Sequence, residues 1–154
     1  MTKQLQSELK QTKPFSSREE AVVLGIQRTA EVLRSRFNEL FKSKGLTGSQ
    51  YNVLRILRGA GASGISCREI GERMITRESD ITRLLDRVEA LGLLRRERQT
   101  GDRRVVLTFI SNAGLSALSE LDVPVTELSR SELGHLSPAE LDSLDQLLAK
   151  VRIK

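Results

Sequence analysis

Residues 66–92 read SCREIGERMITRESDITRLLDRVEALG, and this stretch predicts two short helices joined by a tight connection. Ser66 and Glu69 have the spacing of a capping box, in which a hydroxyl and a carboxylate each accept a backbone N–H at a helix start. A first helix is therefore expected over 67–74. A second is expected over 78–91, because apolar residues recur there at helical spacing and Gly92 supplies a stop. Its apolar positions are Ile81, Leu84, Leu85, Val88 and Leu91.

The next stretch, RRERQTGDRRVVLTF over residues 95–109, predicts a β-hairpin. Residues 93–98 and 104–109 flank a Gly-containing turn at 99–102. The arginines between Gly92 and Arg104 face only two acidic residues, Glu97 and Asp102, which makes this the most basic patch of the chain.

A short helix, a tight connection, a longer helix and an arginine-rich hairpin are, in this order, the parts of a winged helix-turn-helix. In that unit the second helix enters the major groove of DNA, and the hairpin forms the wing. The chain carries 25 Lys and Arg against 20 Asp and Glu, a balance that favours an anionic partner. Double-stranded DNA is therefore the expected partner.

Two helices are expected before this unit. After a polar lead up to Pro14, apolar residues recur at helical spacing over 17–44, and Gly45 ends the run. Thr47 and Gln50 then have the form of a second capping box, which predicts a helix that stops in the loop at 59–61.

Two helical patterns follow the hairpin. The first begins after Ser111, and Pro124 is expected to bend it or divide it in two. The second begins at Ser137 and Pro138, an N-cap followed by proline at the first helical position. It is expected to bury Leu141, Leu144, Leu147, Leu148 and Val151. The expected fold class is mainly α with a small β-hairpin wing.

Polar side chains on the exposed first turns of the 78–91 helix are placed to meet base edges, where arginine can bind guanine bidentately. Helix starts at 49–50 and 66–67 offer N–H groups to phosphates, which fixes orientation rather than sequence. Other interpretations stay open: Glu78 could favour its own helix start, and Asp86 and Arg87 could form intrahelical pairs. The residues expected at DNA are Ser49, Gln50, Ser66, Arg68, Arg77, Ser79, Thr82 and Arg83.

The hairpin tip suggests a second mode of contact. Arg103 and Arg104 are expected to enter a minor groove, whose negative potential rises where it narrows. Asp102 is unfavourable against DNA, and its expected task is to hold the guanidinium of Arg104 in an extended pose before binding.

Several segments resemble the MarR family of bacterial transcriptional regulators: residues 45–54, 70–73 and 81–96. The most specific is Asp102-Arg103-Arg104, which matches the family's Asp-x-Arg wing motif, and residues 110–114 resemble the junction that follows it. The similarity spans nearly the whole chain, including Pro124 and the Ser-Pro-x-Glu sequence at 137–140.

This resemblance implies a homodimer, a repressor in the expected case, that binds a pseudo-palindromic operator. A single domain over 1–154 would hold a winged DNA-binding part at 46–110 and dimerisation helices at 17–44 and 112–154. Wide apolar stripes on the terminal helices agree with intersubunit packing, although packing within one chain is the alternative. The family also implies a cleft in which small aromatic or phenolic anions loosen DNA binding.

Two rival functions remain open. A winged-helix module could dock an acidic protein partner through its arginines without reading DNA, and selection of one DNA sequence over others would separate the two. A regulator of the first kind could also respond to oxidants through Cys67, because a helix N-terminus favours a reactive thiolate. Oxidant-sensing family members carry a cysteine near the N-terminus, where this chain has Phe15. A small packed residue is the other interpretation of Cys67.

Composition and missing motifs narrow the function further. One cysteine and one histidine cannot supply a typical zinc site, and no phosphate-binding loop or catalytic triad is recognisable. No stretch approaches the apolar length of a membrane span, and no signal peptide begins the chain. We therefore expect a cytoplasmic protein that is not an enzyme and uses no cofactor or metal, and the family resemblance implies a bacterial source.

Overall fold

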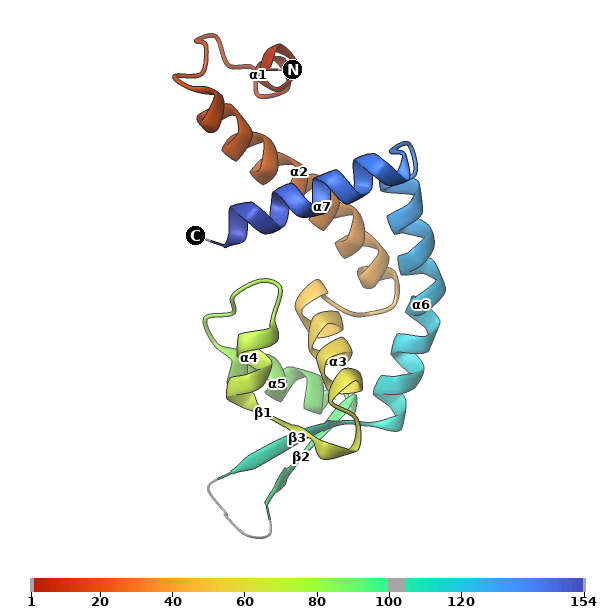
Figure 1. Ribbon diagram of the computed structural model, residues 1–154. Helices are drawn as coiled ribbons and strands as arrows, with labels where there is room; N and C mark the ends of the chain where they lie inside the picture. The colour runs from red at the N-terminus through yellow and green to blue at the C-terminus, as the bar shows by residue number, and fades with distance from the viewer. Residues whose placement is uncertain (1, 100–104, 154) are drawn as a thin grey trace. The chain divides into compact units, whose positions relative to one another are not determined.

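The computed structural model describes residues 2–99 and 105–153. The chain divides into two compact units, residues 1–39 and 40–154. The larger unit holds a three-stranded sheet with helices packed on it, as Figure 1 shows. This mainly α structure with a small antiparallel sheet confirms the expected fold class.

The first unit contains α1 (Thr2–Glu8) and most of α2 (Arg18–Ser43). The polar lead before Pro14, in which no helix was expected, contains α1, and α1 lies near α2: a Cβ on Gly25 would be 3.7 Å from Leu5 Cδ2. Ser17 caps α2 by accepting the Glu20 N–H at 3.1 Å. The helix therefore begins next to the residue that the sequence indicates.

The second unit begins with the end of α2 and with α3 (Gly48–Ala60). Gly45 has φ 73°, the left-handed conformation that glycine adopts readily after a helix. Both bonds of the predicted Thr47–Gln50 capping box are present. The apolar face of α3 forms the centre of the core with α4, α5 and α6, whose most deeply buried side chains are Val53, Leu54, Leu57, Ile70, Leu85, Val88, Leu118 and Leu121.

The sheet has the strand order β1-β3-β2 and is antiparallel throughout. Its strands are β1 (Ile65–Ser66), β2 (Leu94–Arg98) and β3 (Val106–Ile110). The hairpin β2–β3 confirms the predicted wing. A single turn of 3-10 helix, η1 (Gly61–Ser63), leads into β1, which the sequence analysis missed because two residues carry no detectable alternation.

The two helices of the quoted stretch are α4 (Cys67–Arg73) and α5 (Ile81–Ala90). Ser66 and Glu69 form the predicted capping box. The expected start of the second helix at Glu78 is wrong, because Asp80 is its N-cap and accepts the Arg83 N–H at 2.9 Å. Residues 74–80 therefore form a connection between the helices.

The C-terminal helices are α6 (Asn112–Leu133) and α7 (Pro138–Arg152). α6 continues through Pro124, so of the two expected outcomes, a bend or a division, the division into two helices is wrong. Proline removes one intrahelical hydrogen bond, while Leu118 and Leu121 anchor the preceding turns in the core. The expected burial along α7 is also wrong for the single chain, since Leu144, Leu147 and Val151 are exposed.

Candidate nucleic-acid interface

The connection between α4 and α5 is held in place by α3. The side-chain oxygen of Asn52 accepts the Ile75 N–H at 2.8 Å, and the Ser49 hydroxyl donates to the carboxylate of Glu78. Asn52 is buried, so its bond to Ile75 is protected from water. Glu78 therefore binds α3 instead of favouring the start of its own helix. Neither bond is indicated by the sequence, because each joins residues far apart in the chain.

Two of the predicted base-reading residues, Thr82 and Arg83, lie exposed on the first turn of α5. Arg77 and Ser79 are also exposed, but they lie in the connection and not on the helix as expected. The helix start at Asp80 thus divides the expected contact residues into two groups. Thr82 and Arg83 lie on α5, whereas Arg77 and Ser79 precede it.

The buried face of α5 consists of Leu84, Leu85 and Val88, which pack into the core. Its remaining charged residues differ in their partners. Asp86 and Glu89 interact with the wing strand β2, whereas Arg83 and Arg87 do not. Of the open interpretations of Asp86, an intrahelical pair is therefore not the one that forms, because its carboxylate binds Arg96 of β2.

The arginines of this surface differ in their partners. Within residues 2–99 and 105–153, no carboxylate forms an ion pair with Arg77, Arg83 or Arg87. Unpaired guanidinium groups on an exposed helix and its approach can donate to phosphates or bases without losing an existing partner. Four other arginines pair with carboxylates, in the pairs Arg68–Glu72, Arg73–Glu69, Arg95–Glu97 and Arg96 with Asp86 and Glu89.

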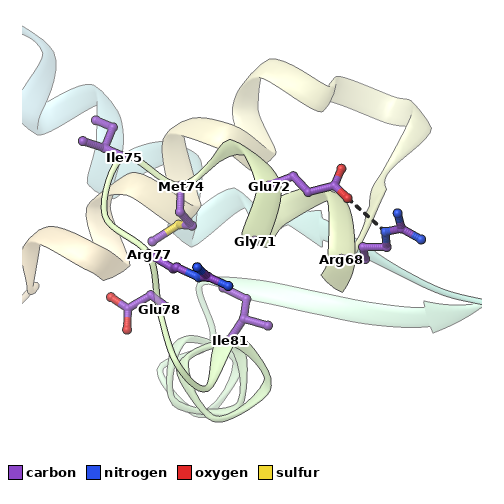
Figure 2. Close-up of a pocket in the computed structure, with 8 residues that line it drawn as sticks. All are labelled: Arg68, Gly71, Glu72, Met74, Ile75, Arg77, Glu78 and Ile81. Carbon is purple, nitrogen blue, oxygen red and sulfur yellow. Dashed lines mark hydrogen bonds and ion pairs between the residues drawn. The ribbon is translucent and has the colours of Figure 1, made fainter. Parts of the chain in front are cut away.

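A shallow pocket of about 480 Å³ lies between α4, the connection and the start of α5. Figure 2 shows Met74, Arg77 and Ile81 converging there, with Arg68 and Glu72 paired on α4. Arg68 is expected at DNA, and its bond to Glu72 is a solvated helical pair, which contributes only about 0.3–0.5 kcal/mol. Arg68 therefore keeps the ability to exchange Glu72 for a phosphate.

The root of the wing is joined to α5 through Arg96. Its Nε lies 2.9 Å from Glu89 Oε2, and its Nη2 lies 2.7 Å from Asp86 Oδ1. The hydrogen bonds to Glu89, and then those to Asp86, raise the pKa of Arg96 above its ordinary value. On the strand's other face, the Arg95 guanidinium lies 4.5 Å from the centre of the Phe109 ring. Both arginines thus serve the structure of the wing.

The helix starts expected at phosphates are already partly occupied. The Gln50 N–H donates to Thr47 Oγ1 at 3.2 Å, and Gln50 Oε1 accepts the Thr47 N–H, so the expectation of a free N–H at Gln50 is wrong. The Ser66 hydroxyl donates to Glu69 at 2.7 Å. Contact of Ser49 and Ser66 with DNA remains a prediction.

Cys67 is half-buried at the start of α4, where its Sγ lies 3.8 Å from Thr82 Oγ1. Its place beside an expected base-reading residue fits a small packed side chain. The predicted wing-tip residues Asp102, Arg103 and Arg104 lie outside the described residues, so their contacts remain predictions.

The described residues contain no cluster of His, Cys, Asp and Glu that could hold a metal ion. None of their helices is both long enough and apolar enough for a transmembrane segment.

Comparisons with known proteins agree with this geometry. The sequence profile of the MarR family matches residues 44–105, which run from the end of α2 to the wing. A MarR transcription factor from Planctomyces limnophilus is 36% identical, with a TM-score of 0.68, over 88% of this chain and 98% of that one.

Two other similar proteins carry functional descriptions. The transcriptional repressor MdtR of Bacillus subtilis is 27% identical over 84% of this chain and 83% of its own. BpsR of Bordetella bronchiseptica, whose DNA binding is regulated by 6-hydroxynicotinic acid, is 25% identical. Its structure covers 86% of this chain and 99% of its own, with a TM-score of 0.76. These relatives are transcriptional regulators and not enzymes. With its winged helix and its resemblance to them, the chain belongs to the MarR family of DNA-binding transcriptional regulators.

Proposed function

We propose that the chain acts as a homodimer that binds a pseudo-palindromic DNA site, with one α5 helix in the major groove of each half-site. The observation that carries this proposal is the set of exposed arginines on α5 and its approach, Arg77, Arg83 and Arg87, which have no carboxylate partner in the described part of the chain. Arg83 and Thr82 would read bases, while Arg68, Arg77, Ser49, Ser66 and Ser79 would orient the protein on the backbone.

The wing would contribute a second contact on each half-site. Its strands carry the chain from α5 toward Asp102, Arg103 and Arg104, whose order matches the family's wing motif. The two arginines would enter the flanking minor groove, with Asp102 holding Arg104 in position.

Dimerisation is supported by the exposed apolar side chains of the C-terminal helix. Leu147 is 59% exposed, Val151 58% and the following Ile153 78%. A row of apolar side chains at helical spacing is more stable when a second surface covers it. The helices at 17–44 and 112–154 would form this interface, and residues 46–110 would form the DNA-binding part.

We further propose that binding represses transcription and that a small aromatic anion releases the protein from DNA. The relatives support both statements: MdtR is a repressor, and the DNA binding of BpsR is regulated by 6-hydroxynicotinic acid. The proposed release predicts weaker DNA binding when such an acid is added, with the neutral amide of the same acid as a control.

The experiment that tests DNA reading is selection of bound duplexes from a random pool at near-physiological salt. The proposal predicts an enriched inverted repeat with half-sites about one helical turn apart. Retention that depends on salt but enriches no sequence would contradict it, and would favour docking of an acidic partner.

A further inference from the structure

We propose that Arg96 is a positioning residue for DNA reading: it sets the wing against α5 and makes no contact with DNA itself. This inference rests on the proposed function, because it concerns how the two DNA-binding elements are held relative to each other. The basic sequence of the hairpin suggests the opposite role, in which every arginine of the wing meets phosphate.

The position of Arg96 on β2 supports this role. Side chains alternate along a strand, so Arg96 lies on the same face of β2 as Leu94, which is 3% exposed and packs into the core. On that face the Arg96 guanidinium meets Glu89 Oε2 at 2.9 Å and Asp86 Oδ1 at 2.7 Å. The backbone N–H of Arg96 also donates to Glu89 Oε1, at 3.2 Å. Side chain and backbone thus bind one turn of α5 together.

The charges around Arg96 also favour positioning over DNA contact. The guanidinium of Arg96 faces two carboxylates, so its positive charge is already compensated within the protein. Its side chain is 27% exposed, in contrast to the exposed Arg83 and Arg87 of α5. A DNA phosphate would have to compete with both carboxylates and would meet their repulsion. Arg96 is therefore poorly suited to bind phosphate and well suited to fix the position of β2 relative to α5.

The contacts of Arg96 join the two elements that are proposed to bind DNA. Arg96 hydrogen-bonds to α5, the helix that carries Thr82, Arg83 and Arg87. Arg96 itself belongs to β2, the strand that leads into the wing tip. Readout of two grooves at once requires that the two elements keep one relative orientation. The bonds between Arg96 and α5 provide this constraint, whereas the tight turn at Gly92 constrains only the backbone between them.

Neutralisation of the acidic partners separates this role from a purely electrostatic one. The double variant Asp86→Asn, Glu89→Gln makes the DNA-facing surface more basic, so charge alone predicts tighter DNA binding. Loss of positioning predicts the reverse. Glu97→Gln is the control, because it removes one acidic charge from the wing strand β2, on the opposite face from Arg96, where Glu97 pairs with Arg95.

The experiment measures binding of each variant to the duplex that the wild type selects and to a scrambled duplex, over a salt series, after thermal unfolding shows that the variant is folded. We expect the double variant to lose about tenfold of its preference for the selected duplex. Glu97→Gln should keep the full preference. An undiminished preference of the double variant for the selected duplex would overturn the inference.

Arg96→Gln gives an independent measurement. We expect a similar loss of preference with an unchanged slope of log affinity against log salt concentration, because no phosphate contact is removed. A slope shallower by about one unit would identify Arg96 as a direct phosphate contact and would overturn the inference. If the wild type selects no duplex at all, the proposed function fails, and that result is distinct from either outcome for the variants.

Discussion

Asp122 of α6 accepts a hydrogen bond from each terminal nitrogen of the Arg58 guanidinium in α3, at 2.9 Å in both cases. This bidentate pair joins the helix at the centre of the winged part to the long helix that follows the wing. Its hydrogen bonds hold the pKa of Asp122 below its ordinary value and raise that of Arg58. The pair is partly exposed, with 38% of the Arg58 side chain and 47% of the Asp122 side chain accessible to solvent.

The first prediction concerns this pair. Asp122→Asn should lower the free energy of unfolding at pH 7 by no more than about 1 kcal/mol, because solvent screens exposed pairs. The difference should be fully present above the ordinary pKa of aspartate and should vanish as the pH falls through the lowered pKa of Asp122. Urea unfolding at several pH values measures it. In an Arg58→Gln background the same substitution should have little effect, and an undiminished effect there would contradict the pairing.

The second prediction concerns the start of α5. Asp80→Ala removes the N-cap acceptor of the Arg83 N–H and should cost about 1 kcal/mol of stability. Asp80→Ser retains a capping oxygen and should cost much less. Equal stability of the two variants in chemical unfolding would show that the helix does not begin at this cap.

The third prediction compares two glycines. A Cβ on Gly114 would lie 2.2 Å from the Leu93 carbonyl oxygen and 2.8 Å from Ile110 Cγ1, so Gly114→Ala should destabilise the protein by about 1–3 kcal/mol. Gly59 lies in α3 with nothing within 4 Å of such a Cβ, and Gly59→Ala should stabilise the protein by up to about 1 kcal/mol. Thermal unfolding of both variants checks the opposite signs, and two changes of the same sign would be inconsistent with this packing.

The fourth prediction tests the proposed dimer. Leu147→Glu places a charge on the exposed apolar row of α7 and should shift the protein from dimer to monomer. Gln146→Glu adds the same charge to the neighbouring exposed position and should leave the dimer intact. Sedimentation measures the molar mass of each. A wild type that is already monomeric, or a Leu147→Glu variant that remains dimeric, would exclude this interface.

Local sequence signals predicted most of the fold. The capping boxes at Thr47, Ser66 and Ser137 all form, and the apolar spacing of α5 placed Leu84, Leu85 and Val88 in the core. Each of these signals depends on residues within one or two turns, which is why a single sequence contains them. The start of α5 was misplaced because Glu78 is compatible with a helix start, and its actual partner, Ser49, lies 29 residues away.

The interactions that shape the candidate site were harder to predict for the same reason. These interactions join different elements of the structure, so no periodicity in the sequence indicates them. They are the bond between Asn52 and Ile75 and the bonds of Arg96 with Asp86 and Glu89. The arginine content of the hairpin suggested one uniform basic patch. In the structure these arginines are not equivalent, because Arg95 and Arg96 form ion pairs with carboxylates of the protein itself.

The central claim is that α5 reads the DNA sequence, and one measurement tests it most directly: selection of duplexes from a random pool by the wild type and by Arg83→Ala in parallel. We predict that the wild type enriches an inverted repeat and that the variant enriches the same repeat with relaxed preference at one position in each half-site, a loss of about 1–3 kcal/mol of discrimination there. Identical preferences at every position for both proteins would contradict the claim.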